Sequence, residues 1–476
     1  MRDIKFGTDG WRAVISDSFT FKNVEIVGQA IADFIKSKKT AIYRKRKIVI
    51  GYDTRFLSNK YAELISCVLA ANGIKVVLSD RPSPTPAVCV YIKDKKFSGG
   101  IMITASHNPP RYNGIKYKGF FAGSAGSDII DAIEKRLYKA PVKTVPFKTA
   151  VKNKKVVLEN IVKIQLDYIK KYANMKLLKK AKLKVLVDSM NGTGGKYFSE
   201  ILKGTDIKLD YMYAENNPGF NGRAPEPHEK HLGEIKGRMK KGKYDLGVAT
   251  DGDSDRLAII DEKGNVLTGH KLMTLLLVHF LRHRKMSGGV VQTVCGTGLI
   301  DKICSEYGLK VYETPVGFKY ICEMMTRKNI LVGGEETGGV GFKGYVPERD
   351  GFLSALMIME LLTAEKKKLS RVVSEINKKY GNYVYEREDL VFPEAKRKKL
   401  ISGLRKEPLK QVLKKKVMEI NDSDGTKFIC EDGSWLLVRL SGTEPKLRIY
   451  SETSSKKRSV EYIKFGKEYA LSLLNK

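Results

Sequence analysis

The chain has 476 residues and is 42% hydrophobic, so it is long and apolar enough for about three or four domains with their own cores. Its formal net charge is +34, but the basic residues lie in short dispersed runs that are not interleaved with aromatic residues. This dispersal, without any nucleic-acid-binding motif, argues against a specific nucleic-acid partner and favours solvated helix faces and a mild attraction for small anions.

The sequence also lacks the signals of secretion or membrane insertion. Residues 1–13 are polar and contain no apolar signal core. The most apolar helical stretch, residues 271–281, has about half the length that a membrane span needs. The six cysteines show no CxxC spacing, which is typical of reduced structural thiols. We therefore expect a cytoplasmic protein without a membrane partner.

One pattern recurs three times along the chain, in residues 47–79, 183–212 and 288–315: an apolar strand, a small polar loop, a helix and a second strand. It predicts three similar α/β domains whose functional loops lie at the carboxyl ends of strands. Beyond about residue 370, short strands with Asp-Gly turns precede a last helix, which predicts an α+β domain. The expected domains are residues 1–152, 153–262, 263–378 and 379–476.

A serine and a histidine stand side by side in the stretch ITASHNPPRYNGIK, residues 103–116, directly after the apolar run GGIMI. Ser106 could be a nucleophile with His107 as its base, but neighbouring residues of an extended chain point to opposite faces. The chain also contains no GxSxG elbow. A loop serine that is held near a metal and stiffened by two prolines fits phosphoryl transfer better.

Three carboxylates follow an apolar strand in the stretch DGDSDR: Asp251, Asp253 and Asp255. In a tight turn they repel one another unless a cation neutralises them, and their oxygens suit Mg²⁺ or Ca²⁺. An EF-hand is excluded because Arg256 stands where that loop needs glycine. Arg256 can instead hold a phosphoryl group against the metal. An acidic turn without a metal is the alternative.

Two further loops carry groups that suit a sugar phosphate, although each alone also fits an ordinary turn. GGEETGG, residues 333–339, offers carboxylates and a hydroxyl for sugar hydroxyls, and RLSGTEPKLR, residues 439–448, resembles a phosphate cradle. No Walker motif occurs. GTGG at 192–195 and CGTG at 295–298 lack the third glycine of a dinucleotide fingerprint, which argues against an oxidoreductase.

The stretches TASHNP, DGDSDR, GEETGG and RLSGTEPKLRIYSE occur in the order in which the α-D-phosphohexomutases carry their phosphoserine, metal, sugar and phosphate loops. The chain resembles this phosphoglucomutase and phosphomannomutase superfamily over its whole length. The resemblance implies four domains around a central cleft, each contributing one loop. It also implies a hexose phosphate as substrate, Mg²⁺ as cofactor, and glucose 1,6-bisphosphate as intermediate and activator.

The resemblance assigns roles to particular residues. Ser106 would carry the phosphoryl group and would share Mg²⁺ with Asp251, Asp253 and Asp255. Lys116 or His107 would act as general acid and base, and Lys116 could serve if cationic neighbours and partial burial lower its pKa. The remaining site residues it implies are Arg12 near the phosphoserine, Arg256, Gly317, Lys319, Glu335 and Thr337 at the substrate, and Arg439, Ser441, Gly442, Thr443 and Arg448 at the non-reacting phosphate.

Three positions bear on the substrate. Thr337 stands where serine is commoner and keeps its hydroxyl. Gly339 stands where the dual-specificity phosphomannomutase/phosphoglucomutase group and the phosphoglucosamine mutases tend to have histidine, and TPVGFKYI, with Lys319, resembles a loop of phosphoglucomutases. We therefore predict a phosphoglucomutase, as a monomer or homodimer. The alternatives are a phosphomannomutase, a dual-specificity enzyme, a phosphoglucosamine mutase and a non-catalytic sugar-phosphate-binding paralogue.

Overall fold

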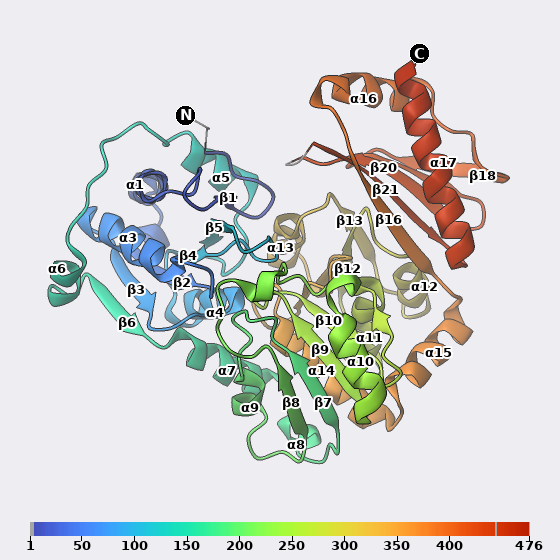
Figure 1. The fold of residues 1–476 in the computed structure, drawn as a ribbon, viewed down its shortest axis with the longest axis horizontal. Helices are drawn as coiled ribbons and strands as arrows, with labels where there is room; N and C mark the ends of the chain where they lie inside the picture. The colour runs from blue at the N-terminus through green and yellow to red at the C-terminus, as the bar shows by residue number, and fades with distance from the viewer. Residues whose placement is uncertain (1–3, 443–444, 476) are drawn as a thin grey trace.

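The computed structural model describes residues 4–442 and 445–475, and the chain forms four successive β-sheets with their helices (Figure 1). The first three sheets mix parallel and antiparallel strands, whereas neighbouring strands of the fourth are antiparallel throughout. This confirms the predicted fold class, three α/β units followed by an α+β unit. No helix in the described ranges is both long and apolar enough to span a membrane.

Alternate side chains of the first sheet pack against helices on its two faces. Ile48 and Ile50 join a core with α1 and α3, whereas Val49 joins the core around α4. The sheet has, in spatial order, β1 (Trp11–Val14), β5 (Tyr112–Gly119), β4 (Gly99–Ile103), β2 (Lys47–Tyr52), β3 (Lys75–Ser79) and β6 (Val156–Glu159). Its helices are α1 (Phe21–Ser37), α2 (Ala41–Arg44), α3 (Ser58–Ala71), α4 (Thr85–Lys95), α5 (Ser127–Glu134) and α6 (Phe147–Lys152).

The second sheet repeats this plan on a smaller scale, and α7 packs against α4, so the first two units share one hydrophobic core. The sheet has the order β11 (Val266–Leu267), β10 (Leu257–Ile260), β9 (Leu246–Thr250), β7 (Lys184–Asp188) and β8 (Lys208–Met212). The helices are α7 (Ile161–Tyr172), α8 (Met175–Leu178), α9 (Tyr197–Ile201), η1 (Phe220–Gly222), η2 (Glu229–His231) and α10 (Gly233–Gly242).

The third unit continues the same core through α11 and α14, which pack against each other. Asp350 caps α14 because its carboxylate accepts the backbone N–H of Leu353. The sheet has the order β13 (Val311–Thr314), β12 (Gly289–Thr293), β14 (Ile330–Gly334) and β15 (Val340–Phe342). The helices are α11 (Gly269–Arg282), α12 (Gly298–Glu306), α13 (Phe318–Arg327), α14 (Gly351–Glu365) and α15 (Leu369–Tyr380).

The fourth unit has a separate core and meets the third through a small cluster that includes Cys295 and Trp435. Its strands confirm the short strands predicted after residue 370, and α17 packs across them. The sheet has the order β16 (Val384–Val391), β21 (Lys446–Thr453), β20 (Trp435–Leu440), β19 (Thr426–Cys430), β18 (Lys415–Asn421) and β17 (Gln411–Val412). The helices are η3 (Glu394–Lys396), α16 (Arg397–Lys406) and α17 (Lys456–Asn475).

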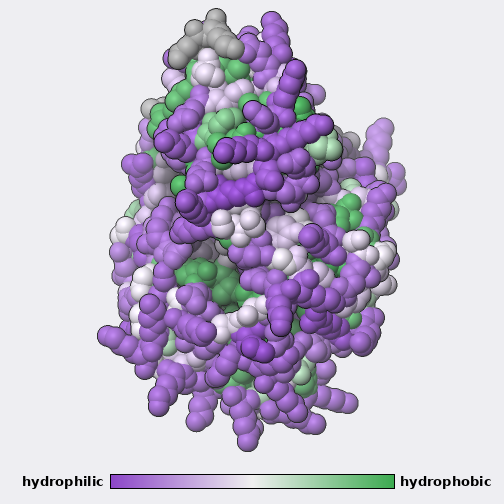
Figure 2. Space-filling view, turned by 90° about the vertical axis from the view of Figure 1, so that its right-hand side faces the viewer, coloured by the Kyte–Doolittle hydropathy of each residue, from purple (hydrophilic) through white to green (hydrophobic). Residues whose placement is uncertain are grey.

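Surface and interior are clearly divided. Figure 2 shows hydrophilic side chains over most of one face, with hydrophobic residues gathered in a hollow near its centre. All six cysteines are buried. Burial raises the pKa of every one of these thiols, which keeps them protonated and suits the structural role expected for them.

The three α/β sheets present their loops in the same way. In each, a buried parallel strand is followed along the chain by an antiparallel partner: β4 by β5, β9 by β10, and β14 by β15. The loops that join these pairs are residues 104–111, 251–256 and 335–339. The stretches that resemble the phosphoserine, metal and sugar loops of the superfamily therefore occupy equivalent positions in three similar sheets. They are called the phosphoserine loop, the metal loop and the sugar loop below. The fourth stretch joins β20 to β21.

Candidate active site

Ser106 lies in a left-handed turn directly after β4. Its φ is 52°, an uncommon value for a residue other than glycine, and its side chain is 1% exposed. The Thr104 hydroxyl accepts the Ser106 N–H at 2.8 Å. The Ser106 Oγ donates a hydrogen bond to Asp251 Oδ2, also at 2.8 Å, so the loop of the first sheet meets the acidic loop of the second. In the described ranges no hydrogen bond joins Ser106 to His107, which agrees with the argument against a Ser-His couple.

The carboxylates of Asp251, Asp253 and Asp255 converge after β9, where each is buried and one oxygen of each lies within 4.8 Å of the others. Burial, and then the charges of Asp253 and Asp255, raise the pKa of Asp251 well above its ordinary range. Asp253 Oδ1 and Asp255 Oδ1 are buried without a hydrogen-bond donor. Buried oxygens that lack donors and belong to hard ligands fit Mg²⁺, so the donor set agrees with the expected metal site.

Direct backbone contact holds these two loops together. A Cβ on Gly252 would lie 2.5 Å from the Ser106 carbonyl oxygen, so only glycine fits between Asp251 and Asp253. The metal loop is also tied to the first unit by Thr85, at the start of α4, whose hydroxyl donates to Asp253 Oδ2 at 2.5 Å. The geometry of Ser106 relative to the carboxylates is thus fixed by packing as well as by its own hydrogen bond.

Lys116 lies on β5 and is 1% exposed, with three carboxylates around its ammonium group. Its Nζ lies 2.8 Å from Asp253 Oδ2, 3.1 Å from Asp255 Oδ2 and 2.9 Å from Asp9 Oδ2. Burial alone would lower the pKa of Lys116, but these carboxylates outweigh it and raise the pKa above its ordinary value. The expectation that cationic neighbours lower this pKa is therefore wrong, because the nearest charged groups are anionic.

Three further expected residues lie around the same point. Arg12 Nη1 donates to Asn108 Oδ1 at 2.8 Å, next to the Ser106 turn. His107 is half-buried with Nδ1 unpaired, and burial together with Arg256 and Arg12 holds its pKa well below the ordinary range, so the ring is neutral. The backbone N–H of Arg256 donates to Asp251 Oδ1 at 3.1 Å. The structure thus brings cationic and anionic side chains together where the Ser106 loop meets the metal loop.

Arg349 is a central residue of this site that the sequence analysis missed. It is 2% exposed, and its Nη2 lies 2.7 Å from Asp255 Oδ2 and 2.9 Å from Asp9 Oδ2. Its Nη1 donates to Glu335 Oε2 at 3.1 Å. One guanidinium therefore joins the metal loop to the sugar loop, residues 335–339. The available signal was the charged triplet Glu-Arg-Asp directly before the apolar run of α14.

The sugar loop after β14 carries Glu335 and Thr337. Burial raises the pKa of Glu335 to about 7, although Arg349 opposes the shift. The Thr337 hydroxyl is buried without a hydrogen-bond partner, so it can still accept or donate. A Cβ on Gly339 would lie 2.2 Å from Arg349 Cδ, so glycine is needed where the arginine crosses the loop.

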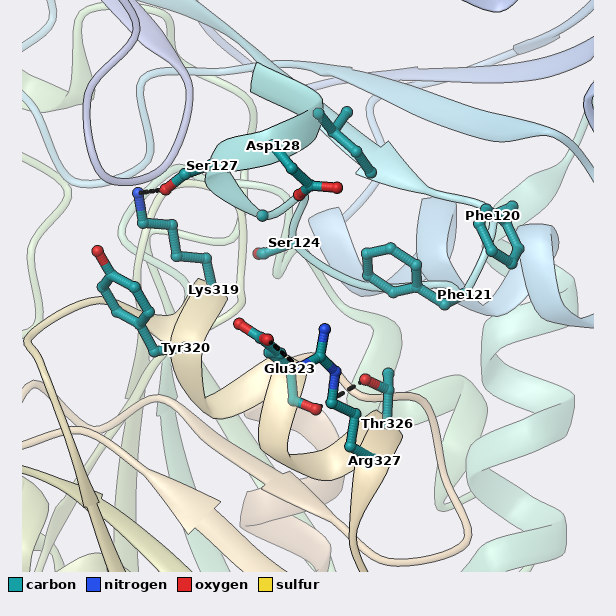
Figure 3. Close-up of a pocket in the computed structure, with 12 residues that line it drawn as sticks. Phe120, Phe121, Ser124, Ser127, Asp128, Lys319, Tyr320, Glu323, Thr326 and Arg327 are labelled. Carbon is teal, nitrogen blue, oxygen red and sulfur yellow. Dashed lines mark hydrogen bonds and ion pairs between the residues drawn. The ribbon is translucent and has the colours of Figure 1, made fainter. Parts of the chain in front are cut away.

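Lys319 lies at the junction between α13 and the first unit. Gly317 adopts a φ of 131° just before α13, and a Cβ there would lie 2.4 Å from Thr8 Cγ2. Lys319 Nζ donates to Ser127 Oγ at 2.9 Å across a pocket of about 610 Å³ (Figure 3). This pocket is lined by the start of α5, the chain before it and α13, and it includes Ser124, whose hydroxyl contacts Glu348 beside Arg349.

The expected phosphate-binding residues lie on the β20–β21 hairpin. Arg439 Nε lies 2.8 Å from Asp424 Oδ2, and the Ser441 carbonyl accepts a hydrogen bond from Arg397 at 2.8 Å. Arg448 lies opposite Arg439 in the strand register. Gly442 follows in the turn, and Thr443 lies outside the described residues. The side chains of these two arginines therefore lie on one face of the hairpin, Arg439 beside Asp424 and Arg448 beside Asp389.

Comparison with known proteins agrees with this arrangement of loops. Models of phosphoglucomutase/phosphomannomutase domains match in sequence order: domain I at residues 3–142, domain II at 166–264, domain III at 268–380 and the C-terminal domain at 361–464. The chain belongs to this family. It is therefore a phosphohexomutase, an enzyme of the superfamily that the four sequence stretches resemble.

Individual relatives match over nearly their whole length. A phosphoglucomutase/phosphomannomutase of Thermococcus kodakarensis is 32% identical, covering 97% of each chain, and a phosphoglucosamine mutase of Nautilia profundicola is 30% identical, covering 99% of each. Among solved structures, a Thermus thermophilus protein provisionally described as a phosphomannomutase is 29% identical with a TM-score of 0.85, covering 98% of each chain. These phosphohexomutases carry different substrate names, so family membership leaves the choice of sugar open.

Proposed function

We propose that this phosphohexomutase interconverts glucose 1-phosphate and glucose 6-phosphate by phosphoryl transfer to and from Ser106. The observation that supports transfer most directly is the 2.8 Å hydrogen bond from Ser106 Oγ to Asp251 Oδ2, at the edge of a buried carboxylate cluster. A serine oxygen in that position, when phosphorylated, would place its phosphoryl group beside the carboxylates that would hold the cation. Such an arrangement suits a phosphoryl carrier better than a hydrolytic nucleophile.

The chain's own residues divide the work of transfer. Asp251, Asp253 and Asp255 would hold Mg²⁺, which supplies charge compensation for a phosphoryl group. The sugar hydroxyl attacks the phosphorus of phosphoserine, the O–P bond of Ser106 breaks, and the hydroxyl proton must pass to a base. Return of the other phosphoryl group of the 1,6-bisphosphate to Ser106 completes the exchange.

Two residues remain candidates for moving that proton. His107 is a neutral imidazole with an unpaired Nδ1, but its lowered pKa makes it a weak base, and Lys116 is an ammonium that can donate a proton. Arg12, whose guanidinium donates to Asn108, and Arg256, whose backbone N–H donates to Asp251, carry the positive charge that a phosphoryl group requires. Glu335 and Thr337 would bind sugar hydroxyls, and Arg439, Ser441, Gly442, Thr443 and Arg448 would bind the non-reacting phosphate.

The preference for glucose rests on two parts of the chain, the position of Gly339 and the loop that carries Gly317 and Lys319. Arg349 fills the space beside Gly339, so no side chain can extend from the position where dual-specificity enzymes and phosphoglucosamine mutases tend to carry histidine. Gly317 and Lys319 stand in a loop that resembles that of phosphoglucomutases. Phosphoglucosamine mutase is the second candidate, because relatives such as the Nautilia profundicola protein bear that name.

A coupled assay with glucose-6-phosphate dehydrogenase tests the proposal, in the presence of Mg²⁺ and catalytic glucose 1,6-bisphosphate. The comparison is of kcat/KM for glucose, mannose and glucosamine 1-phosphates, with product of the latter two followed by ³¹P NMR. The highest value for glucose supports the proposal, and the highest value for glucosamine assigns the second candidate. Ser106→Ala should abolish turnover and also the mass increase of about 80 Da that marks phosphoserine. Turnover at the wild-type level in Ser106→Ala would refute the mechanism.

A further inference from the structure

Arg55 lies in the turn between β2 and α3, 3% exposed, beneath the loop that carries Ser106. Its two terminal nitrogens together donate four hydrogen bonds to backbone carbonyls of that loop. Nη1 donates to Pro109 and Tyr112, each at 2.9 Å, and Nη2 donates to Ser106 at 2.7 Å and to Asn108 at 2.6 Å. The loop thus folds around a single guanidinium, with its carbonyl groups turned inward.

The same turn also holds the other side of the Ser106 residue. Arg55 Nε lies 3.1 Å from Asp53 Oδ2, and this carboxylate accepts the Thr104 hydroxyl at 2.6 Å. The Thr104 oxygen in turn accepts the backbone N–H of Ser106 at 2.8 Å. The N–H of Ser106 and its carbonyl oxygen are therefore both held by one connected set of groups that begins at Asp53 and Arg55. This accounts for the left-handed φ of Ser106, which an unsupported serine would rarely keep.

Residues of the second unit also contact the turn that carries Arg55. The ring of Phe220 lies 5.1 Å from the Arg55 guanidinium carbon, and the Thr54 hydroxyl donates to the Asn191 carbonyl at 2.9 Å. Each N–H of the two terminal nitrogens has a carbonyl acceptor, and Nε is buried beside Asp53, so Arg55 has no accessible N–H left for a phosphate. Its action on the reaction must pass through the loop.

We propose that Arg55 is the positioning residue of the phosphoryl-carrier loop: it holds Ser106 Oγ in register with the carboxylates of the metal loop. The inference rests on the proposed transfer through Ser106 and adds a residue that acts without touching substrate or metal. Lysine cannot replace it, because three N–H groups on one nitrogen cannot reach four separated carbonyls. A displacement of the reacting oxygen by about 1 Å is expected to cost roughly 100-fold in rate.

The test compares Arg55→Lys with a matched control, Arg111→Lys, which changes an exposed arginine of the same loop. In Arg55→Lys we expect kcat to fall about 10- to 100-fold with KM for the sugar phosphate within about twofold of wild type. The rate at which glucose 1,6-bisphosphate phosphorylates Ser106 should fall by the same factor. Intact-mass analysis of quenched time points measures this rate. The control should leave all three quantities unchanged. A raised KM with unchanged kcat would overturn the proposal, because it would make Arg55 a substrate-binding residue.

Hydrogen exchange tests the role of Arg55 without an activity assay, so its result does not depend on which reaction the enzyme catalyses. The amides of Asn108 and Tyr112, which donate within the loop to Ala105 and Pro109, should exchange slowly in wild type and at least about tenfold faster in Arg55→Lys. Wild-type protein that lacks activity on every hexose phosphate would refute the proposed function, whereas this exchange result would still support the role of Arg55. Fast exchange of both amides in wild type would overturn that role, even if the variant does not fold.

Discussion

Arg349 Nη2 lies 2.7 Å from Asp255 Oδ2, so a buried arginine that precedes α14 pairs with the last carboxylate of the metal loop. The same guanidinium contacts Asp9 near the N-terminus and Glu335 after β14. Loops of the first three units therefore share one cation. A substitution of Arg349 should therefore affect both the metal loop and the sugar loop.

Replacing Arg349 by Met should destabilise the protein by about 3–5 kcal/mol, because it leaves buried carboxylates without their counter-charge. Arg349→Lys keeps the charge but loses the fork that spans Asp255 and Glu335, so kcat/KM should fall at least about tenfold with a smaller loss of stability. Urea unfolding and steady-state kinetics measure the two effects. The control is Arg327→Lys, at an arginine that is 73% exposed and pairs with Glu323, which should change stability by less than about 0.5 kcal/mol. An equally small effect at Arg349 would show that the buried charges do not depend on it.

The pH dependence of activity should report Glu335. Burial raises its pKa to about 7, so the carboxylate that would accept hydrogen bonds from sugar hydroxyls is lost as the pH falls below that value. We expect kcat/KM to fall about tenfold for each pH unit below 7. Glu335→Gln should lower kcat/KM at pH 8 and flatten this limb of the profile. An unchanged acid limb in Glu335→Gln would assign it to another group.

The stability of the same variant should change with pH in a defined direction. Since the folded pKa of Glu335 is raised above the unfolded value, its stabilising contribution is present below pH 4 and is lost as the pH rises through about 7. Glu335→Gln should therefore gain stability relative to wild type between pH 5 and pH 8, by about 1–3 kcal/mol in urea unfolding. Glu461→Gln, at an exposed glutamate, should show no such trend. A difference that is constant with pH would contradict the raised pKa.

Binding of Mg²⁺ should raise the melting temperature, because the carboxylates of Asp251, Asp253 and Asp255 repel one another without it. At a concentration 100 times the dissociation constant, the stabilisation should be about 2.7 kcal/mol. Asp253→Asn should remove most of this increase, whereas Asp422→Asn, at an exposed aspartate, should keep it. Differential scanning fluorimetry with MgCl₂ or EDTA makes the comparison. An increase of the same size in Asp253→Asn would place the ion elsewhere.

The sequence predicts those parts of the fold and site that depend on neighbouring residues. The repeated strand-loop-helix-strand pattern predicts the α/β units, and the spacing of Asp251, Asp253 and Asp255 predicts their convergence, because both follow from local geometry. The turn that holds Ser106 also follows a strand that its apolar residues predict. The roles of these residues in catalysis stay predictions.

The rest depends on contacts between residues far apart in the chain. Arg349 and Asp9 are 340 positions apart, and Arg55 contacts carbonyls more than 50 positions away, so no local pattern indicates the partners of either arginine. The Lys116 pKa was predicted wrongly for the same reason. Asp253 and Asp255 reach Lys116 only once the first two units pack together, and Asp9 reaches it through the pairing of β1 with β5. Local sequence shows which groups are present, whereas the packing of the units decides which charges meet.

Gly252 offers a test of how closely the two loops must approach. An added Cβ would lie 2.5 Å from the Ser106 carbonyl oxygen, and neither backbone can move without disturbing Asp251 or Ser106. Gly252→Ala should therefore reduce kcat by about 100-fold and weaken the stabilisation by Mg²⁺. The matched control is Gly237→Ala within α10, where no atom lies within 4 Å of the added Cβ. It should keep full activity and gain up to about 1 kcal/mol in urea unfolding, since alanine favours the helix. Full activity in both variants would mean that the loops tolerate separation and that the hydrogen bond from Ser106 to Asp251 is not needed for turnover.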